Sequence, residues 1–273
     1  MIRILETKEN IKILCIGDFH TGSNSGLLPP KSMSFDGEIV TEILQNKVQK
    51  WLWRNYLEDL TTIGKVDIII NLGDNIEGAQ VKIMGRTLES SDIDVQKDWS
   101  VKTLQTAIDI CKPKFFLGVS GTNYHIRLNG NCNADLAIYK ALEQVNPDVK
   151  FAYSDLLLVK IGRLTWSIAH AYPTTEFVTP PIEKLIKQHG LEYLLGNTVR
   201  IDVFVRGHAH SHIWERYRGG IYGFVTPCQQ PTSAYGREKA YLAVRHPDIG
   251  ILGIMQQGSD LIPKPLLHKW VER

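Results

Sequence analysis

Hydrophobic positions in the first half of the chain alternate between short continuous runs and helically spaced patterns. The continuous runs predict buried strands, at residues 11–16, 67–71 and 114–119. Apolar residues at helical spacing predict three helices, at residues 38–60, 95–111 and 133–144. Because these strands are apolar along their whole length and alternate with helices, we expect an α/β sheet that is covered on both faces.

The pattern changes in the second half, where short strand-like runs follow one another closely. These runs lie at residues 151–153, 156–161, 164–169, 203–206, 212–217, 221–226 and 249–255. One helical pattern, at residues 182–195, interrupts them, and the sequence Arg218-Gly219-Gly220 predicts a hairpin between two of the strands. No linker, repeat or low-complexity tract divides the sequence, so we expect a single domain over residues 1–273.

The overall composition excludes few classes of protein. The 273 residues are 43% hydrophobic, which is enough for a sizeable core. The formal net charge of +2 argues against a strongly basic nucleic-acid-binding surface, although a local basic patch remains compatible with it. The four cysteines form no C-x-x-C pair, and we expect them to be reduced, buried thiols.

The apolar runs of the sequence do not indicate a membrane protein. The N-terminal segment has no long apolar run after its basic residue, so it does not resemble a signal peptide. No stretch approaches the ~20 consecutive apolar residues that a membrane span needs. We therefore expect a cytoplasmic protein without a membrane partner.

Each of several predicted strands is followed directly by residues that can bind a metal ion. In chain order these residues are Asp18, His20, Asp74, Asn123, His125, His170, His208 and His210. The carboxyl ends of strands in an open α/β sheet border the ligand crevice, so residues far apart in sequence can meet there. Each residue alone is more often a turn or surface residue. Their joint appearance at successive strand ends favours a metal site.

The motifs that carry these residues resemble those of a known family. GDFH (17–20), GDN (73–75), GTNYH (121–125), AH (169–170) and GHAH (207–210) look like the five motifs of the calcineurin-like metallophosphoesterases. The resemblance implies a four-layer α-β-β-α sandwich with two mixed sheets. It also implies two divalent metal ions, of which Mn is favoured over Fe or Zn.

The resemblance also implies how the ligands are divided between the two ions. One ion would be held by Asp18, His20, Asp74 and His210. The other would be held by Asp74, Asn123, His170 and His208, with Asp74 bridging the two. A ligand set of nitrogen and oxygen without cysteine argues against a closed structural zinc site.

The third motif departs from the G-N-H-D/E pattern of the family. Here it runs Gly121-Thr122-Asn123-Tyr124-His125, with one extra residue on each side of the asparagine. Either Asn123 presents its amide oxygen to the metal, or Thr122 fills that slot and Asn123 is a loop residue. An amide carbonyl is the better ligand, which favours Asn123. His125 is then the expected acid that protonates the leaving oxygen.

These residues predict an enzyme that hydrolyses a phosphate ester. Two ions about 3.5–4 Å apart bind phosphoryl oxygens and lower the pKa of a bridging water, and the hydroxide attacks phosphorus in line. The expected substrate is a phosphodiester in DNA, RNA or a nucleotide, so the enzyme would be a phosphodiesterase, a nuclease or a phosphatase. Asp74 and His125 are the predicted catalytic residues, and the loops at residues 21–36 and 75–92 are expected to contact substrate.

Two other hypotheses explain the sequence less well. An inactive binding or scaffold protein on the same fold would lack ligands, whereas every ligand type is present here. A barrel-type amidohydrolase would carry H-x-H at its first strand and an aspartate late, and this chain has the reverse order. Glu77 is expected to be an exposed loop acid, and the sequence leaves the oligomeric state open.

Overall fold

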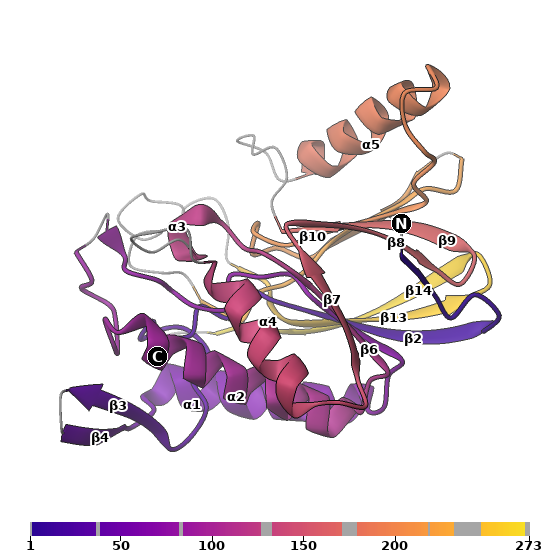
Figure 1. The fold of residues 1–273 in the computed structure, drawn as a ribbon. Helices are drawn as coiled ribbons and strands as arrows, with labels where there is room; N and C mark the ends of the chain where they lie inside the picture. Colours follow the sequence, from indigo (N-terminus) through magenta and orange to yellow (C-terminus); the bar gives the residue numbers. More distant parts are fainter. Residues whose placement is uncertain are drawn as a thin grey trace.

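The computed structural model contains two six-stranded sheets that lie face to face, with helices on both outer sides (Figure 1). The structure describes residues 2–36, 39–81, 84–126, 133–170, 179–217, 219–231 and 247–270. The helices are α1 (Lys47–Ile63), α2 (Ile93–Cys111), α3 (Asn123–Ile126), α4 (Ala134–Val145) and α5 (Thr179–Leu194).

One sheet is built mainly from the second half of the chain. Its strand order is β1 (Ile2–Ile4), β8 (Leu156–Ile161), β9 (Leu164–Ala169), β10 (Val203–Arg206), β12 (Tyr222–Val225) and β11 (Ile213–Arg216). The neighbours β9, β10 and β12 are parallel, whereas β8–β9 and β11–β12 are antiparallel pairs. The sheet is therefore mixed.

The other sheet joins the first half of the chain to its C-terminal strands. Its order is β14 (Asp260–His268), β13 (Ile249–Gln257), β2 (Asn10–Ile16), β5 (Ile68–Asn71), β6 (Phe115–Val119) and β7 (Lys150–Ser154). The four strands from β2 to β7 run parallel, and β13 pairs antiparallel with both β2 and β14. The carboxyl ends of β2, β5 and β6 consequently lie along one edge.

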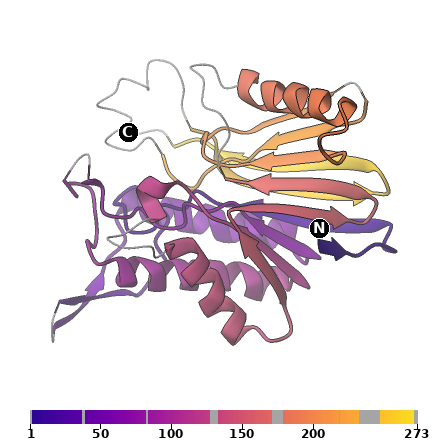
Figure 2. The same cartoon turned by 45° about the horizontal axis from the view of Figure 1, so that its top comes forward.

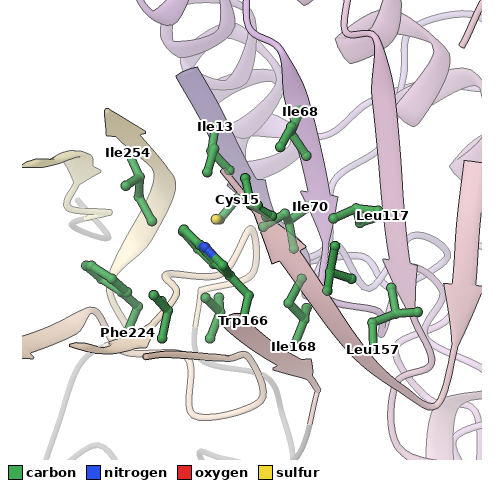
Figure 3. Close-up of a cluster of buried hydrophobic side chains, with 14 of the residues drawn as sticks. Ile13, Cys15, Ile68, Ile70, Leu117, Leu157, Trp166, Ile168, Phe224 and Ile254 are labelled. Carbon is green, nitrogen blue, oxygen red and sulfur yellow. The ribbon is translucent and has the colours of Figure 1, made fainter. Parts of the chain in front are cut away.

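Alternate residues of the facing strands fill the space between the two sheets. Ile13 and Cys15 of β2 point inward toward Trp166 and Ile168 of β9 (Figure 3). The intervening residues of β2 point outward and pack under α1, α2 and α4, where Tyr56 is fully buried. This alternation is what a sheet that is covered on both faces requires.

The fourth layer is α5, which lies on the outer face of the sheet that contains β10 and β12, on the opposite side of the molecule from α1, α2 and α4 (Figures 1 and 2). Its residues Ile182 and Ile186 pack in one buried cluster with Phe204 and Val225. The layers therefore follow the order helix, sheet, sheet, helix. This arrangement confirms the predicted α-β-β-α sandwich with two mixed sheets.

The predicted helix at residues 38–60 is wrong over its first part. Ile39–Ile43 forms β4, which pairs with β3 (Ser32–Asp36) in a hairpin that projects from the helical layer (Figure 1). Helix α1 begins only after Asn46, whose side chain accepts a hydrogen bond from the Gln49 N–H and forms a capping box. This cap fixes the start of the helix, so the apolar residues that precede it are not helical and follow their local preference for β-structure.

The C-terminal region contains a strand that the hydrophobic pattern misses. Prolines 263 and 265 interrupt the apolar run of β14, which is an edge strand and therefore tolerates residues without an N–H donor. The antiparallel pairing of β11 and β12 confirms the predicted hairpin, although Arg218 itself lies outside the described residues.

The cysteines agree with the expectation of free thiols. Cys15, Cys111 and Cys228 are buried and unpaired, and Cys132 lies outside the described residues. Burial raises the pKa of Cys111 to about 11, so its thiolate is scarce at neutral pH. Among the helices in the described ranges, none has the length and apolar character needed to cross a membrane.

Replacement of the central aromatic residue between the sheets should be costly. Trp166 has no exposed surface, and Trp166→Ala should lower the free energy of unfolding by about 3–5 kcal/mol because it leaves a cavity. Urea unfolding followed by circular dichroism measures the change. The matched control is Trp214→Ala, because Trp214 is 45% exposed and should lose less than about 1 kcal/mol. Equal losses in the two variants would contradict this account of the core.

Candidate metal centre

Four strands from the two sheets deliver their carboxyl-terminal loops to one place. The backbone N–H of Asp18, after β2, donates to Gly73 O (2.9 Å), after β5, and His20 N–H donates to Asp74 O (3.1 Å). In the other sheet, the N–H of Gly207, after β10, donates to His170 O (3.0 Å), after β9. Between the sheets, His208 N–H donates to Asp18 Oδ2 (3.2 Å). These hydrogen bonds within the protein hold the loops together without the help of a metal ion.

The backbone at this edge adopts a conformation that L-residues avoid. Ten non-glycine residues in the described ranges have positive φ, and half of them are predicted ligands: Asp18 (50°), His20 (49°), Asp74 (48°), His208 (69°) and His210 (51°). Left-handed backbone at non-glycine residues costs free energy and is concentrated at functional sites. The strain therefore coincides with the predicted site.

The approach of the loops also requires a residue without a side chain. A Cβ atom on Gly121 would lie 2.0 Å from Asp74 Oδ1 and 2.3 Å from the Asp74 nitrogen. Only glycine can occupy this position without displacing the carboxylate.

The predicted residues form three overlapping groups of potential metal ligands. One group is Asp18, His20 and His210, another is Asp74, His170 and His208, and the third is His20, Asp74 and His125. In the first group His20 Nε2 lies 3.1 Å from His210 Nε2, and Asp18 Oδ1 lies 3.4 Å from the same atom. In the second group His170 Nε2 lies 2.9 Å from Asp74 Oδ2.

These distances fit residues that converge on shared cations. Ligand atoms that each lie about 2.0–2.2 Å from one ion are separated from one another by about 3.0–3.5 Å. Asp18 Oδ1 and His170 Nε2 are buried, and among the described residues their nearest polar partners are other predicted ligand atoms, His210 Nε2 (3.4 Å) and Asp74 Oδ2 (2.9 Å), in contacts without well-aligned hydrogen-bond geometry. Buried polar atoms normally have a partner, so these atoms are suited to binding a metal ion.

The charges of the two carboxylates control the protonation of the surrounding histidines. Burial lowers the pKa of His170, but the charges of Asp74 and Asp18 outweigh it and raise the pKa to about 9. Burial and the neighbouring charge of His170 lower the pKa of His208 to about 4. Burial acts against the ionised form of Asp74, yet His170 and His125 hold its pKa well below the usual range. The site thus attracts positive charge, and cation binding would release protons from it.

The third motif places Thr122, rather than Asn123, against Asp74. The Thr122 N–H donates to Asp74 Oδ1 (2.6 Å), and the Thr122 hydroxyl lies 3.2 Å from the same oxygen. Helix α3 begins at Asn123 because Thr122 O accepts hydrogen bonds from the N–H groups of His125 and Ile126. Asn123 is exposed at this turn. Of the two alignments that the sequence allows, the geometry agrees with the one that puts Thr122 in the asparagine slot.

Two residues at the site carry roles that the sequence analysis missed. Glu77 was expected to be exposed, but it is 5% exposed and its Oε2 lies 3.1 Å from His20 Nδ1. Asp135, in the first turn of α4, accepts hydrogen bonds from the backbone N–H groups of Asp74 (3.1 Å), Asn75 (3.2 Å) and Gly121 (2.7 Å). It thereby fixes the second and third motifs relative to each other. The only sequence signal for Asp135 was an acidic residue about ten positions after the third motif.

Comparisons with known proteins found similar solved structures but no matching family. No protein-family profile and no curated protein matches the chain. Among solved structures, an archaeal phosphodiesterase is similar at 11% identity and a TM-score of 0.43, covering 94% of this chain and 100% of its own. A zinc complex of Vps29 from Entamoeba histolytica has 13% identity, 94% and 99% coverage, and a TM-score of 0.41. A dimetal phosphatase from Danio rerio has 10% identity, 93% and 98% coverage, and a TM-score of 0.39.

The four-layer fold and the order of the ligand residues along the chain agree with the resemblance to the calcineurin-like metallophosphoesterases that the sequence motifs carry.

The position of Asn123 can be tested by its effect on metal binding. Asn123 is exposed, and Thr122 is the residue that contacts Asp74. Asn123→Ala should therefore change the affinity for Mn²⁺ by less than about 2-fold. Loss of a group that supports a metal site typically lowers the affinity by about 10–100-fold. Isothermal titration calorimetry on metal-free protein measures the affinity, with His208→Ala as the variant that should weaken it. A loss in Asn123→Ala as large as in His208→Ala would restore Asn123 as a ligand.

Proposed function

We propose that the chain is a dinuclear, metal-dependent phosphodiesterase. The observation that carries this proposal is the convergence of two buried carboxylates and four histidines into two adjacent groups of ligands. The first group, Asp18, His20 and His210, would hold one ion. The second group, Asp74, His170 and His208, would hold the other. Mixed nitrogen and oxygen ligation suits Mn, Fe and Zn, and Mn is the ion we favour.

The residues of the chain prepare this centre for a phosphate ester. When bound, two divalent cations would neutralise the charge of the phosphoryl oxygens and lower the pKa of a water molecule. Asp74, which the family resemblance makes the bridging ligand, is held in orientation by the N–H and hydroxyl of Thr122. His170 Nδ1 lies against Leu72 O, so Nε2 is the atom directed at Asp74.

His125 is the residue we assign to protonation of the leaving oxygen. Its Nδ1 lies 2.7 Å from Glu77 O, where it can only donate a hydrogen bond. Nε2 is therefore the nitrogen that takes up and releases a proton, and the acid is the imidazolium form that carries a proton on both nitrogens. The His125 ring packs edge-on against His20, with ring centroids 4.6 Å apart, so it borders the ligand groups and belongs to one of them. A histidine at this place can deliver a proton to an alkoxide leaving group.

The substrate we propose is a phosphodiester in a nucleic acid or a nucleotide. The segments at residues 21–36 and 75–92 directly follow the ligand residues His20 and Asp74 and are the natural substrate-contacting segments. A phosphomonoesterase is the alternative activity of the same centre. An inactive scaffold protein would have gaps in the ligand set, whereas all six carboxylate and histidine ligands fall within the two groups.

Loss of the central carboxylate should remove both metal retention and turnover. Asp74→Asn removes the charge that attracts the cations, and we expect hydrolysis to fall by more than about 10²-fold. The measurement combines metal analysis with a Mn²⁺-dependent assay panel of an aryl monoester, an aryl diester, single- and double-stranded DNA, RNA and dinucleotide polyphosphates. Asp109→Asn, at an exposed position of α2, is the control. Full activity in the presence of a chelator would contradict the metal mechanism.

Loss of His125 should depend on the leaving group. His125→Ala should slow substrates with alkoxide leaving groups by about 10²–10⁴-fold, because those oxygens need a proton in the transition state. Activated aryl esters should lose much less, since a phenolate leaves without one. Comparison of kcat/KM on an alkyl and an aryl diester measures the difference. His189→Ala, which removes a histidine that packs on Phe204, serves as the control. Equal losses on both substrates would remove His125 from the acid role.

A further inference from the structure

Glu77 is a buried carboxylate that the proposed reaction leaves without a role. It lies three residues after Asp74 and is 5% exposed. Its Oε2 is 3.1 Å from His20 Nδ1 and accepts a hydrogen bond from Gln230 Nε2 (3.2 Å), and its Oε1 accepts one from Gln80 Nε2 (2.9 Å). A buried carboxylate is costly unless its charge is compensated, so these contacts need an explanation.

The backbone of Glu77 contacts a second histidine. Its carbonyl oxygen lies 2.7 Å from His125 Nδ1, and its N–H donates to Thr21 O (2.9 Å) in the loop that carries His20. Glu77 therefore lies against the Nδ1 atoms of two histidines, His20 and His125, that belong to the same ligand group.

The other nitrogen of each imidazole is thereby directed away from Glu77. His20 Nε2 lies 3.1 Å from His210 Nε2, within the group that also contains Asp18. A neutral imidazole carries one N–H, so an acceptor at Nδ1 keeps the proton there and leaves a lone pair on Nε2. A lone pair on Nε2 is what coordination of an ion by His20 requires.

The other side chains that bind the Glu77 carboxylate are uncharged, so they do not neutralise its negative charge, which remains available to His20. Gln80 and Gln230 are neutral amides, and the charged or ionisable side chain in direct contact with Glu77 among the described residues is His20. Gln230 follows β12, and the adjacent Gln229 donates its N–H to Asp18 O (3.0 Å). The network thus connects three of the loops that form the site.

We propose that Glu77 is a positioning residue that holds both His20 and His125 as the Nδ1–H tautomer. Its carboxylate fixes His20, and its main-chain carbonyl fixes His125. The inference rests on the proposed function only in taking the ligand groups to bind divalent ions. Groups that orient metal-binding histidines in this way typically contribute 10–100-fold to metal affinity.

The two contacts predict different responses to one substitution. Glu77→Gln replaces the carboxylate by an amide that can turn its N–H₂ group toward His20 Nδ1, so His20 should shift toward the Nε2–H tautomer. His125 should not shift, because its partner is a backbone carbonyl that every variant retains. His125 is therefore an internal control for damage to the fold.

The experiment uses the full chain with ¹⁵N-labelled histidine, free of metal, and Mn²⁺ as the probe. Nitrogen chemical shifts report the tautomers, and a His20→Asn sample assigns the His20 signals. Isothermal titration reports the affinity for Mn²⁺, which should fall about 10–100-fold in Glu77→Gln. Glu89→Gln is the matched control, because Glu89 lies in the same loop and its carboxylate accepts a hydrogen bond from Gln49.

Two results would overturn the inference. One is an Nε2–H tautomer of His20 in the metal-free native protein, which decides the question even if Glu77→Gln fails to fold. The other is a folded Glu77→Gln variant with an unchanged His20 tautomer and a Mn²⁺ affinity within 2-fold of Glu89→Gln. Failure of the proposed function has a different signature, because a native protein that hydrolyses no phosphate ester would leave both measurements intact.

Discussion

The structure of the site depends on two buried carboxylates, Asp18 and Asp74, which lie at the edge where strands from both sheets end. Both have at most 1% of their surface exposed, so neither can remain ionised without compensation. Histidines and backbone N–H groups supply it, including the N–H of Thr122 and that of His208. The positive φ angles of the ligand residues are a cost of bringing these groups together.

The fold makes this convergence possible because the residues that stabilise it and the residues that form the site lie in different places. The core between the sheets and the core under α1, α2 and α4 are apolar, whereas polar residues are concentrated in the loops that follow the strands. Parallel strands then bring together residues that are distant in sequence, so His20 Nε2 and His210 Nε2 lie 3.1 Å apart. Asp135 and Glu77, which belong to neither ligand group themselves, connect these loops. The site is therefore largely formed by the protein alone.

The sequence predicts the parts that depend on local pattern and leaves out those that depend on tertiary contact. Continuous apolar strands were placed well, and residues 156–161, 164–169 and 203–206 agree with the structure at both ends. The hairpin strand β4 was mistaken for helix because its apolar spacing also fits a helix, and only the cap at Asn46 distinguishes the two. Asn123 was favoured as a ligand on chemical grounds, but the start of α3 turns it to solvent. Glu77 resembles any loop acid until its distance from His20 is known.

The central claim is that this edge of the sandwich binds two divalent ions through the two ligand groups. The most direct measurement is an anomalous difference map from crystals grown with Mn²⁺. The account predicts two peaks, one against Asp18, His20 and His210 and the other against Asp74, His170 and His208. A map with no peak at these residues, or with Mn²⁺ bound only elsewhere on the chain, would contradict it.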